Sequence, residues 1–456
     1  MTVPVAANDP TGVVGEAGYN TDNIPSPLSA RQADLKQAAH EMVLQGQVTA
    51  TGDNKVVKVA PGQYVELAFE GSDNILTLLG QFGTGDDPTH GGTRNHVNRH
   101  DPDNNAAQNT DHNQIPEPDR SVDNTTIWVD DFSQDYYDHL LYDQGQDPSM
   151  ANMYLELSSG RYTVDGYVSD WVDVPFNAAN YGSNYCGDIV CQDTWFFVQD
   201  QVNAWYQAQL DAGMSEADIE AMLAEFDVWD RYDYNGNGNF DEPDGYIDHF
   251  QSVHAGEGEE TGGGSLGTDA IWSHRWYVQL NPIGSAGPMV GGEENPLGGI
   301  QLGNSSKWIG DYTIEPENGG VGVFAHEFGH DLGLPDLYDT SGNTGGAENS
   351  TAFWTLMSSG SYGSTGVPAD AIGTRPVHMG AWEKFFLGWL DYQVARPGKN
   401  TSIRLGPASF TTRQTQAAFV VLPDNHVFRS IGAPFEGSQY YYSGNGANLD
   451  TTMTRS

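Results

Sequence analysis

The sequence predicts a mixed α/β fold, of the α+β kind, that is divided into several segments. Helical periodicity alternates with short runs of β-forming residues, and a Gly-, Asp-, Asn- and His-rich stretch over 84–114 interrupts them. Beyond about residue 395 the composition changes to short apolar runs with Gly and Pro. We therefore expect a disordered tail over 1–27, an N-terminal segment over 28–115, a central domain over 116–395 and the start of a β-rich region over 396–456.

The N-terminal segment should contain one helix, a small sheet and a polar linker. Residues 29–45 carry an apolar face, and Gly46 suits the position after a helix end. Alternating apolar runs over 56–83 predict strands. The linker that follows should be exposed, and its histidines are candidate metal ligands, although a solvated linker explains them better. These histidines are His96, His100 and His112.

The central domain should combine strands with two amphipathic helices. A long helix is expected over 194–210, and a second helix should begin at the capping box formed by Ser215 and Asp218. Residues 312–315 are a candidate edge strand for pairing with an extended peptide. Further strands are expected at 127–129, 162–168 and 245–255, and a short aromatic helix at 381–390.

The strongest chemical signal is His-Glu-x-x-His over 326–330. Residues i and i+4 share one face of a helix, so His326 and His330 can bind one metal ion together. Glu327 is placed to take a proton from the attacking water. Gly333 permits a sharp turn after the helix, which can bring Asp336 back as a third ligand. Zinc accepts such nitrogen and oxygen ligands, and a catalytic site keeps its fourth position open.

Two alternatives for the third ligand remain open at this point. Glu348 stands where a downstream glutamate ligand would stand in another large class of zinc enzymes, and Asp339 is a weaker rival. A second element, Trp-Thr-Leu-Met-Ser-Ser-Gly over 354–360, follows the histidine motif closely. It is similar to the Met-turn beneath the metal of metzincin proteases, which would make Met357 an apolar floor.

Together these motifs resemble the immune inhibitor A family of secreted bacterial metallopeptidases. Residues 326–339 and the Met-turn carry the resemblance, and residues 113–124 and 269–275 agree with it. The resemblance implies a zincin or metzincin-like catalytic domain, a zinc-dependent endopeptidase made as a zymogen, and an N-terminal propeptide. It also implies that the β-rich region after 395 is the beginning of a longer C-terminal part. Protein or peptide substrates are the partners that this family implies.

The charge of the chain is unusual. There are 62 acidic residues against 19 basic ones, for a net charge of −43. Such a charge argues against binding to nucleic acid or to anionic membrane surfaces. No run of apolar residues is long enough to predict a transmembrane helix. We expect an extracellular, monomeric protein that is able to bind calcium.

Two cysteines, Cys186 and Cys191, stand close together around Gly187. They can close a short disulfide loop, which suits an oxidising compartment; two free thiols are the alternative. A zinc knuckle is excluded because no second pair of cysteines exists.

A second metal site is predicted over 233–244. Oxygen-bearing side chains fall at positions 1, 3, 5, 9 and 12 of a calcium loop, a glycine falls at position 6, and a backbone carbonyl is expected at position 7. The alternative is an Asn/Gly-rich turn. The candidate ligands are Asp233, Asn235, Asn237, Asn239, Asp241 and Asp244.

A function of a different class is also compatible with these motifs. A non-catalytic extracellular binding module could use zinc and calcium for stability alone. Such a module has no need of Glu327, so the acidic residue inside the motif favours the enzyme.

Overall fold

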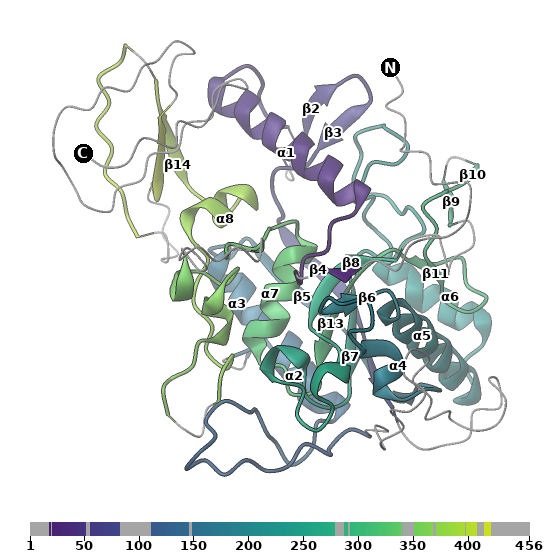
Figure 1. Ribbon diagram of the computed structural model, residues 1–456. Helices are drawn as coiled ribbons and strands as arrows, with labels where there is room; N and C mark the ends of the chain where they lie inside the picture. The colour runs from purple at the N-terminus through teal and green to yellow at the C-terminus, as the bar shows by residue number, and fades with distance from the viewer. Residues whose placement is uncertain are drawn as a thin grey trace.

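A five-stranded mixed sheet forms the centre of the computed structural model (Figure 1). Four neighbouring strands run parallel, and the fifth, β8, is antiparallel to β13 and lies at the edge. In sheet order the strands are β5 (Tyr162–Asp173), β4 (Gly71–Gln81), β7 (Phe250–His254), β13 (Asp311–Pro316) and β8 (His274–Tyr277). The structure describes residues 18–19, 21–51, 55–82, 111–145, 148–278, 287–290, 292–338, 340, 351–367, 371–396, 398–407 and 415–420.

Three expectations about the strands are wrong. The apolar run that forms β4 was grouped with a separate N-terminal sheet, but β4 pairs with β5 and β7 in the middle of the main sheet. The expected edge strand at 312–315 is interior, because β8 covers its free side. Residues 127–129 form no strand. Apolar runs reveal a strand, but long-range pairing decides which neighbours it has.

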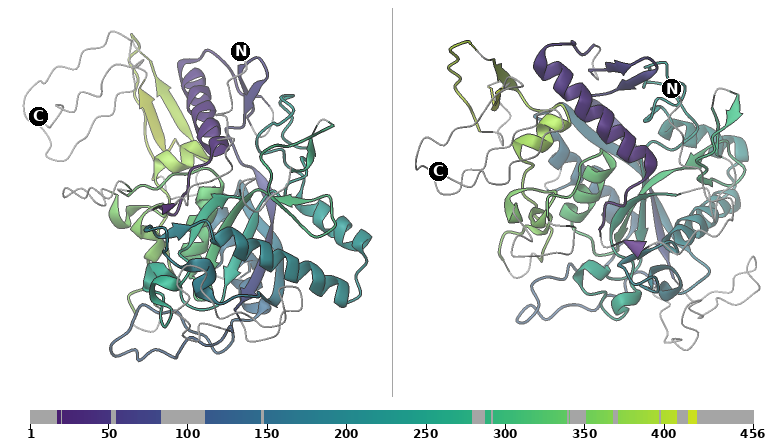
Figure 2. Two further views of the ribbon diagram at one scale, coloured as in Figure 1. Left: turned by 45° about the vertical axis from the view of Figure 1, so that its right-hand side comes forward. Right: turned by 45° about the horizontal axis from the view of Figure 1, so that its top comes forward.

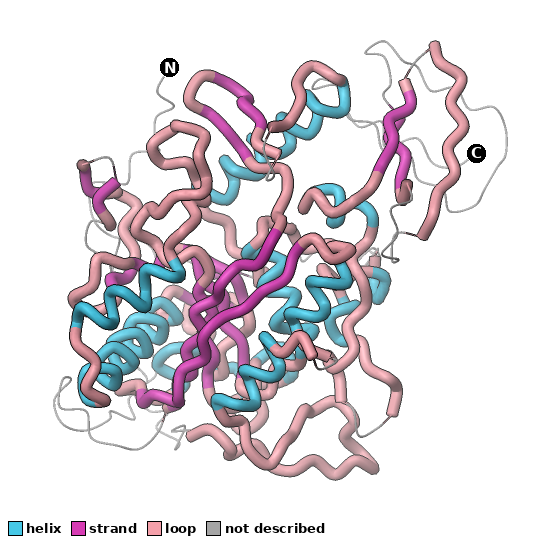
Figure 3. Tube along the Cα trace, turned by 180° about the vertical axis from the view of Figure 1, so that it is seen from behind, coloured by secondary structure: helices cyan, strands magenta, loops and turns pink. Residues whose placement is uncertain are grey.

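Helices cover both faces of the sheet and produce three layers (Figures 1 and 3). Alternate residues of β4 enter two cores: Leu76 and Leu78 pack on one side, and Ile75 and Leu79 on the other. The first face carries α4 (Ala178–Gly182), α5 (Thr194–Asp211) and α6 (Glu216–Leu223). The second carries α2 (Gln134–Tyr142), α3 (Met150–Leu157) and α7 (Val321–Asp331). The predicted helix at 194–210 and the Ser215–Asp218 capping box are therefore confirmed.

The N-terminal helix and a hairpin form a small unit on top of this body (Figure 2). The unit consists of α1 (Pro27–Gln45), β2 (Val57–Ala60) and β3 (Gln63–Val65). Its own core is small and consists of Ala39, Val57, Val65 and Leu67. Ser26 caps the start of α1, and Gly46 at φ 76° ends it as expected. The expected disordered tail does not reach residue 27, because residues 21–26 lie against the main body of the molecule.

The remaining elements are short. The two-residue strands are β1 (Gly18–Tyr19), β6 (Val190–Cys191), β9 (Met289–Val290), β10 (Glu293–Glu294), β11 (Ile300–Gln301) and β12 (Trp308–Ile309). The 3-10 turns are η1 (Ala224–Phe226), η2 (Glu259–Thr261), η3 (Gly267–Asp269), η4 (Ala352–Trp354) and η5 (Ser359–Tyr362). Towards the C-terminus, α8 (Ala381–Phe386) precedes the parallel pair β14 (Tyr392–Ala395) and β15 (Ala417–Val420). None of the helices in the described ranges is both long and apolar enough to cross a lipid bilayer.

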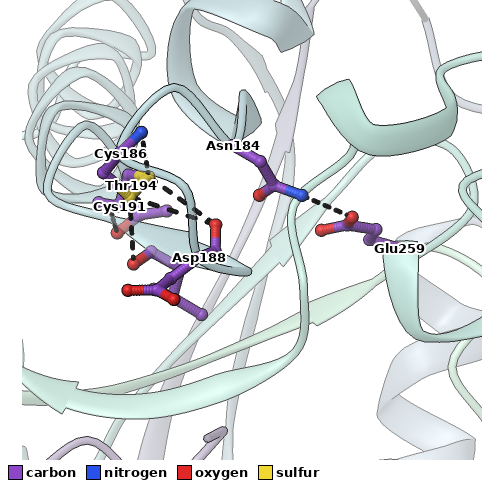
Figure 4. The surroundings of a disulfide bond; sticks show 7 residues. Asn184, Cys186, Asp188, Cys191, Thr194 and Glu259 are labelled. Carbon is purple, nitrogen blue, oxygen red and sulfur yellow. Dashed lines mark hydrogen bonds between the residues drawn. A yellow bond between two sulfur atoms is a disulfide. The ribbon is translucent and has the colours of Figure 1, made fainter. Parts of the chain in front are cut away.

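A disulfide joins Cys186 to Cys191 in the loop before α5 (Figure 4). The Cα atoms are 6.0 Å apart, and Thr194 at the start of α5 donates to the carbonyl of Cys191 at 3.0 Å. Asn184 of the same loop donates to Glu259 at 2.6 Å, which ties the loop to η2. The two cysteines thus close a loop between the sheet and the long helix.

Candidate metal centre

Helix α7 carries the His-Glu-x-x-His motif through the core of the molecule. It begins after Gly320, and every one of its residues is buried. Its sequence, VGVFAHEFGHD, is apolar around nearly the whole helix, so it is suited to burial on all sides. The motif residues are therefore fixed by packing rather than exposed on a mobile surface.

The two histidine rings converge through their ε nitrogens. The Nε2 atoms of His326 and His330 lie 3.0 Å apart. Each Nδ1 lies 2.7 Å from a carbonyl oxygen, of Leu356 and of Leu334 respectively. Because a carbonyl only accepts, each Nδ1 carries the proton and each Nε2 keeps a free lone pair. Two lone pairs at this distance repel each other unless a cation lies between them.

Asp336 completes a three-residue ligand set. Its Oδ1 lies 3.2 Å from Nε2 of His330 and 3.6 Å from Nε2 of His326, and it has no hydrogen-bond partner. Gly333 adopts φ +94°, and this left-handed turn redirects the chain after the helix. The rivals Asp339 and Glu348 lie outside the described residues. Nitrogen and carboxylate donors of this kind fit a zinc ion.

A fourth residue, Asp22 of the N-terminal segment, lies beside the same two histidines. Its carboxylate oxygens lie 3.5 Å from Nε2 of His330 and 3.7 Å from Nε2 of His326. Asp22, His326, His330 and Asp336 are the group in the described residues whose donor atoms could hold one metal ion. The sequence analysis missed Asp22, because an aspartate in a Gly/Asn-rich tail has no local signal that ties it to a helix so far along the chain.

Glu327 is buried beside the histidines. Its side chain is only 2% exposed, and its Oε2 has no hydrogen-bond partner among the described residues. Burial raises the pKa of Glu327 well above its ordinary value, and the negative charge of Asp22 raises it further. A carboxylate with a raised pKa is a stronger base, which suits a group that must take up a proton.

The Met-turn lies directly under α7. Met357 is fully buried, and a Cβ added at Gly329 would stand 2.6 Å from its Sδ, so the sulfur touches the helix backbone. The turn also holds the ligands, since Leu356 accepts from His326 and Met357 accepts from the backbone N–H of Leu337 at 2.8 Å. The loop with Asp336 is therefore bonded to the same turn as the helix.

Two tyrosines lie near the centre, and one of them is bonded to Asp22. The hydroxyl of Tyr338 donates to Asp22 at 2.7 Å. Burial raises the pKa of Tyr362, and the nearby charges of Glu260, Asp22 and Glu327 add to the effect. Both phenols are therefore protonated hydrogen-bond donors near neutral pH.

A buried ion cluster secures the C-terminal end of α7. Arg231 donates to both carboxylate oxygens of Asp331 at 2.8 and 2.9 Å and to its backbone carbonyl at 3.0 Å. His249, which directly precedes β7, bonds the same carboxylate. Burial would lower the pKa of His249, but Asp331 and Asp73 raise it to about 9. Asp331 directly follows the ligand His330, so this cluster fixes the helix end at the metal centre.

The predicted calcium loop lies close to this cluster in the sequence. Oδ1 of Asp233 accepts from the N–H of Gly238 at 3.0 Å, while its buried Oδ2 has no hydrogen-bond partner. Three candidate ligands instead share a partner that the prediction did not include, because Asn235, Asn237 and Asn239 all donate to Glu242. Asp244 accepts from Tyr246, and burial raises its pKa well above the ordinary value.

Of the three candidate histidines of the linker, His112 is described and lies outside the group of metal-binding residues. His112 stacks on Trp171 at 4.9 Å and bonds Gln81 at 2.6 Å. His96 and His100 lie outside the described residues.

A cavity of about 670 Å³ opens beside His330 and lies between α1 and the main body of the molecule. Its walls include Arg275 of β8 and Pro335 of the ligand loop on one side. Lys36 and His40 of α1 line the other side. The N-terminal helix thus covers the approach to the metal centre.

Comparisons with known proteins agree with this geometry. Residues 62–390 match the family described as immune inhibitor A peptidase M6, catalytic domain. Immune inhibitor A of Bacillus thuringiensis subsp. alesti is 37% identical over 348 residues, which cover 72% of this chain and 47% of that protein. The pre-pro-metalloprotease PrtV of Vibrio cholerae serotype O1, strain M66-2, is 35% identical over 349 residues, which cover 73% of this chain and 35% of that protein.

This chain spans about half or less of the length of those relatives. The matched region includes β4 and the whole candidate metal centre apart from Asp22. It begins after α1 and β2, so the helix that covers the cavity lies ahead of it.

Proposed function

Since the chain belongs to the immune inhibitor A peptidase family M6, we propose that it is a zinc-dependent endopeptidase acting on protein substrates. The observation that carries the proposal is the buried Glu327 beside two histidines whose free ε nitrogens converge within 3.0 Å. A site built for stability alone has no use for an unpartnered buried carboxylate next to the ligands. We also propose that its catalytic domain has a metzincin-like zincin fold.

His326, His330 and Asp336 would hold the zinc ion. Bound there, zinc supplies Lewis-acid chemistry, which polarises the scissile carbonyl and lowers the pKa of water. Glu327 accepts the proton of the attacking water and delivers it to the leaving amine. The carbonyls of Leu356 and Leu334 keep the histidine rings in one orientation and tautomer.

Other residues of the chain complete the site. Met357 forms an apolar floor and does no chemistry itself. Tyr338 and Tyr362 are protonated donors that lie near the centre, and either can stabilise the negative charge that develops on the substrate oxygen. The Arg231–Asp331 pair keeps the end of α7 in place during the reaction.

Secretion and synthesis as a zymogen belong to the same proposal. The disulfide between Cys186 and Cys191 and the strongly acidic composition suit an extracellular protein. The propeptide would be the part of the chain ahead of the family match, since β4 belongs to the catalytic sheet. We further propose that the loop over 233–244 binds calcium, because Asp233 has the bond to Gly238 that such loops need and a free buried oxygen.

The decisive experiment replaces Glu327 by Gln in the full chain. Casein hydrolysis, measured before and after limited trypsin treatment, should fall at least about a thousandfold, because general-base catalysis is lost. Zinc content, measured on the same samples, should remain that of the unaltered protein. Glu70→Gln on the exposed surface is the matched control and should leave hydrolysis unchanged. If the unaltered protein cleaves no protein substrate in either state, the enzyme is excluded and the binding module is favoured.

A further inference from the structure

The segment before α1 lies along the edge strand of the catalytic sheet. The N–H of Ile24 donates to the carbonyl of Arg275 at 3.0 Å, and the N–H of Arg275 donates to the carbonyl of Asp22 at 2.7 Å. These two bonds make a parallel bridge between Asn23 and Arg275 of β8. An exposed strand edge is where an extended peptide can add to a sheet, so this segment occupies a place that a substrate could use.

Side chains of the same segment bond the loop that carries the third ligand. Thr21 donates to Oδ2 of Asp336 at 3.0 Å, and Asn23 donates to the carbonyl of Leu334 at 3.1 Å. Leu334 also accepts from His330. The segment is thereby held at both the sheet edge and the ligand loop, with Asp22 between the two contacts.

Asp22 presents its carboxylate, rather than its peptide group, to the centre. Its carbonyl accepts from Arg275 and is turned toward β8, while its Oδ1 lies 3.5 Å from His330 Nε2 and has no hydrogen-bond partner. Tyr338 holds the other carboxylate oxygen at 2.7 Å. The peptide carbonyl of Asp22 is therefore turned away from the histidines, and a carboxylate oxygen lies beside the nitrogens that would hold zinc, a metal whose catalytic sites leave one position for water.

Helix α1 follows directly and covers the cavity beside His330. The residues of α1 that are described as buried are only three, namely Lys36, Ala39 and His40. Lys36 lies between the rings of Phe69 and Phe386, at 4.5 and 4.3 Å from their centroids, and Arg396 donates to the carbonyl of Gln45 at 3.0 Å. An interface of this kind can separate without exposing a large apolar core.

We propose that residues 21–26 form an internal inhibitor in which Asp22 is a fourth metal ligand that excludes the reactive water. The proposal rests on the proposed function, because it assigns the regulation of the same site. It requires that residues 21–26 leave β8 before a substrate can bind. Release of α1 is the event that permits this, since α1 and the segment are continuous.

The test compares Asp22→Ala with Asp34→Ala, an exposed aspartate of α1, in the full chain. The first readout uses Co²⁺ in place of zinc: its visible absorption spectrum should change in Asp22→Ala and stay the same in Asp34→Ala. The second is the rate at which a chelator removes the metal, which should rise about tenfold or more when a ligand is lost. The third is hydrolysis of a fluorogenic peptide, which should increase in Asp22→Ala before any proteolytic treatment.

Inhibition by a separate peptide tests the same idea without a variant that could fail to fold. The acetylated peptide with the sequence of residues 21–26 should inhibit the trypsin-treated protein, and the same peptide with Asn in place of Asp22 should inhibit at least about tenfold less. Acetylation removes the α-amino group as a competing ligand. If Asp22→Ala matches the unaltered protein in spectrum and metal release while the treated protein is active, Asp22 is no ligand and the inference fails, although the proposed function stands. If no form is active but the spectrum changes, the proposed function fails instead.

Discussion

The two chain segments that meet at the metal centre are built differently. Helix α7 is buried along its whole length, and its ligands are bonded to the backbone of the Met-turn and of the following loop. In α1 the residues described as buried are Lys36, Ala39 and His40, and two of these three are titratable. The difference teaches that one segment is fixed by the hydrophobic core, whereas the other buries few residues and can therefore be released at a lower cost in free energy.

The titratable groups of the two segments also respond to pH in opposite directions. His249 supports the end of α7 and is stabilised as a cation by Asp331 and Asp73. His40 of α1 is stabilised as a neutral ring, because burial and the nearby charge of Lys36 lower its pKa to about 4. Acid should therefore loosen α1 while it leaves the catalytic helix secure.

The largest expected effect separates the two aspartates of the centre. Asp336→Ala removes a ligand from the fixed segment, so zinc affinity should fall by more than the about 10–100-fold that outer-shell partners contribute. Asp22→Ala should reduce affinity much less, since the three remaining ligands are held by the core. Competition with a chromophoric chelator measures both. An equal loss in the two variants would remove the distinction between fixed and releasable ligands.

The next effect concerns the support of α7. Asp331→Asn breaks the buried pair with Arg231 and leaves a cation without its partner, so the free energy of unfolding should fall by about 3–5 kcal/mol. Urea denaturation measures this. Glu70→Gln breaks the exposed pair with Lys55 and should change the same quantity by about 0–1 kcal/mol. Similar values for both variants would show that the cluster does not fix the helix end.

The pH dependence of the catalytic body should follow His249. Its pKa is raised in the folded protein to about 9, so its contribution is complete below its unfolded value near 6.5 and disappears as the pH rises through 9. The free energy of unfolding should fall by about 3 kcal/mol over this pH interval, and denaturation curves at several pH values measure the change. His249→Gln should be less stable at pH 6 and should lack most of this slope.

The smallest expected effect is acid release of α1. The lowered pKa of His40 means that its contribution to docking is present above pH 6.5 and is lost as the pH falls toward 4. Glu66 supports this response, because it stabilises the charge of Lys36, and that charge disfavours a protonated His40. Limited proteolysis within residues 27–45 should be several-fold faster at pH 5 than at pH 7. His40→Gln should remove this acceleration, whereas His378→Gln, at a half-buried histidine that pairs with Glu156, should retain it.

Local patterns in the sequence were sufficient for much of the molecule. Helices α1, α5 and α6 were predicted from periodicity, together with the glycine that ends α1 and the capping box that begins α6, because these signals act within one or two turns. The strands were harder to interpret, since β4 was grouped with the wrong sheet and β8 was not recognised as the edge. Strand neighbours depend on contacts between residues far apart in the chain, and periodicity contains no record of them.

The same division holds at the candidate metal centre. The sequence by itself pointed to His326, Glu327 and His330 through the helix period, and it favoured Asp336 over Glu348 and Asp339 because one turn at Gly333 can bring it back to the histidines. Only the tertiary structure decided that Asp22 joins them and that Asn235, Asn237 and Asn239 turn toward Glu242. The physical reason is that local backbone geometry fixes near neighbours, whereas the docking of one segment on another depends on the shape and charge of surfaces formed after folding.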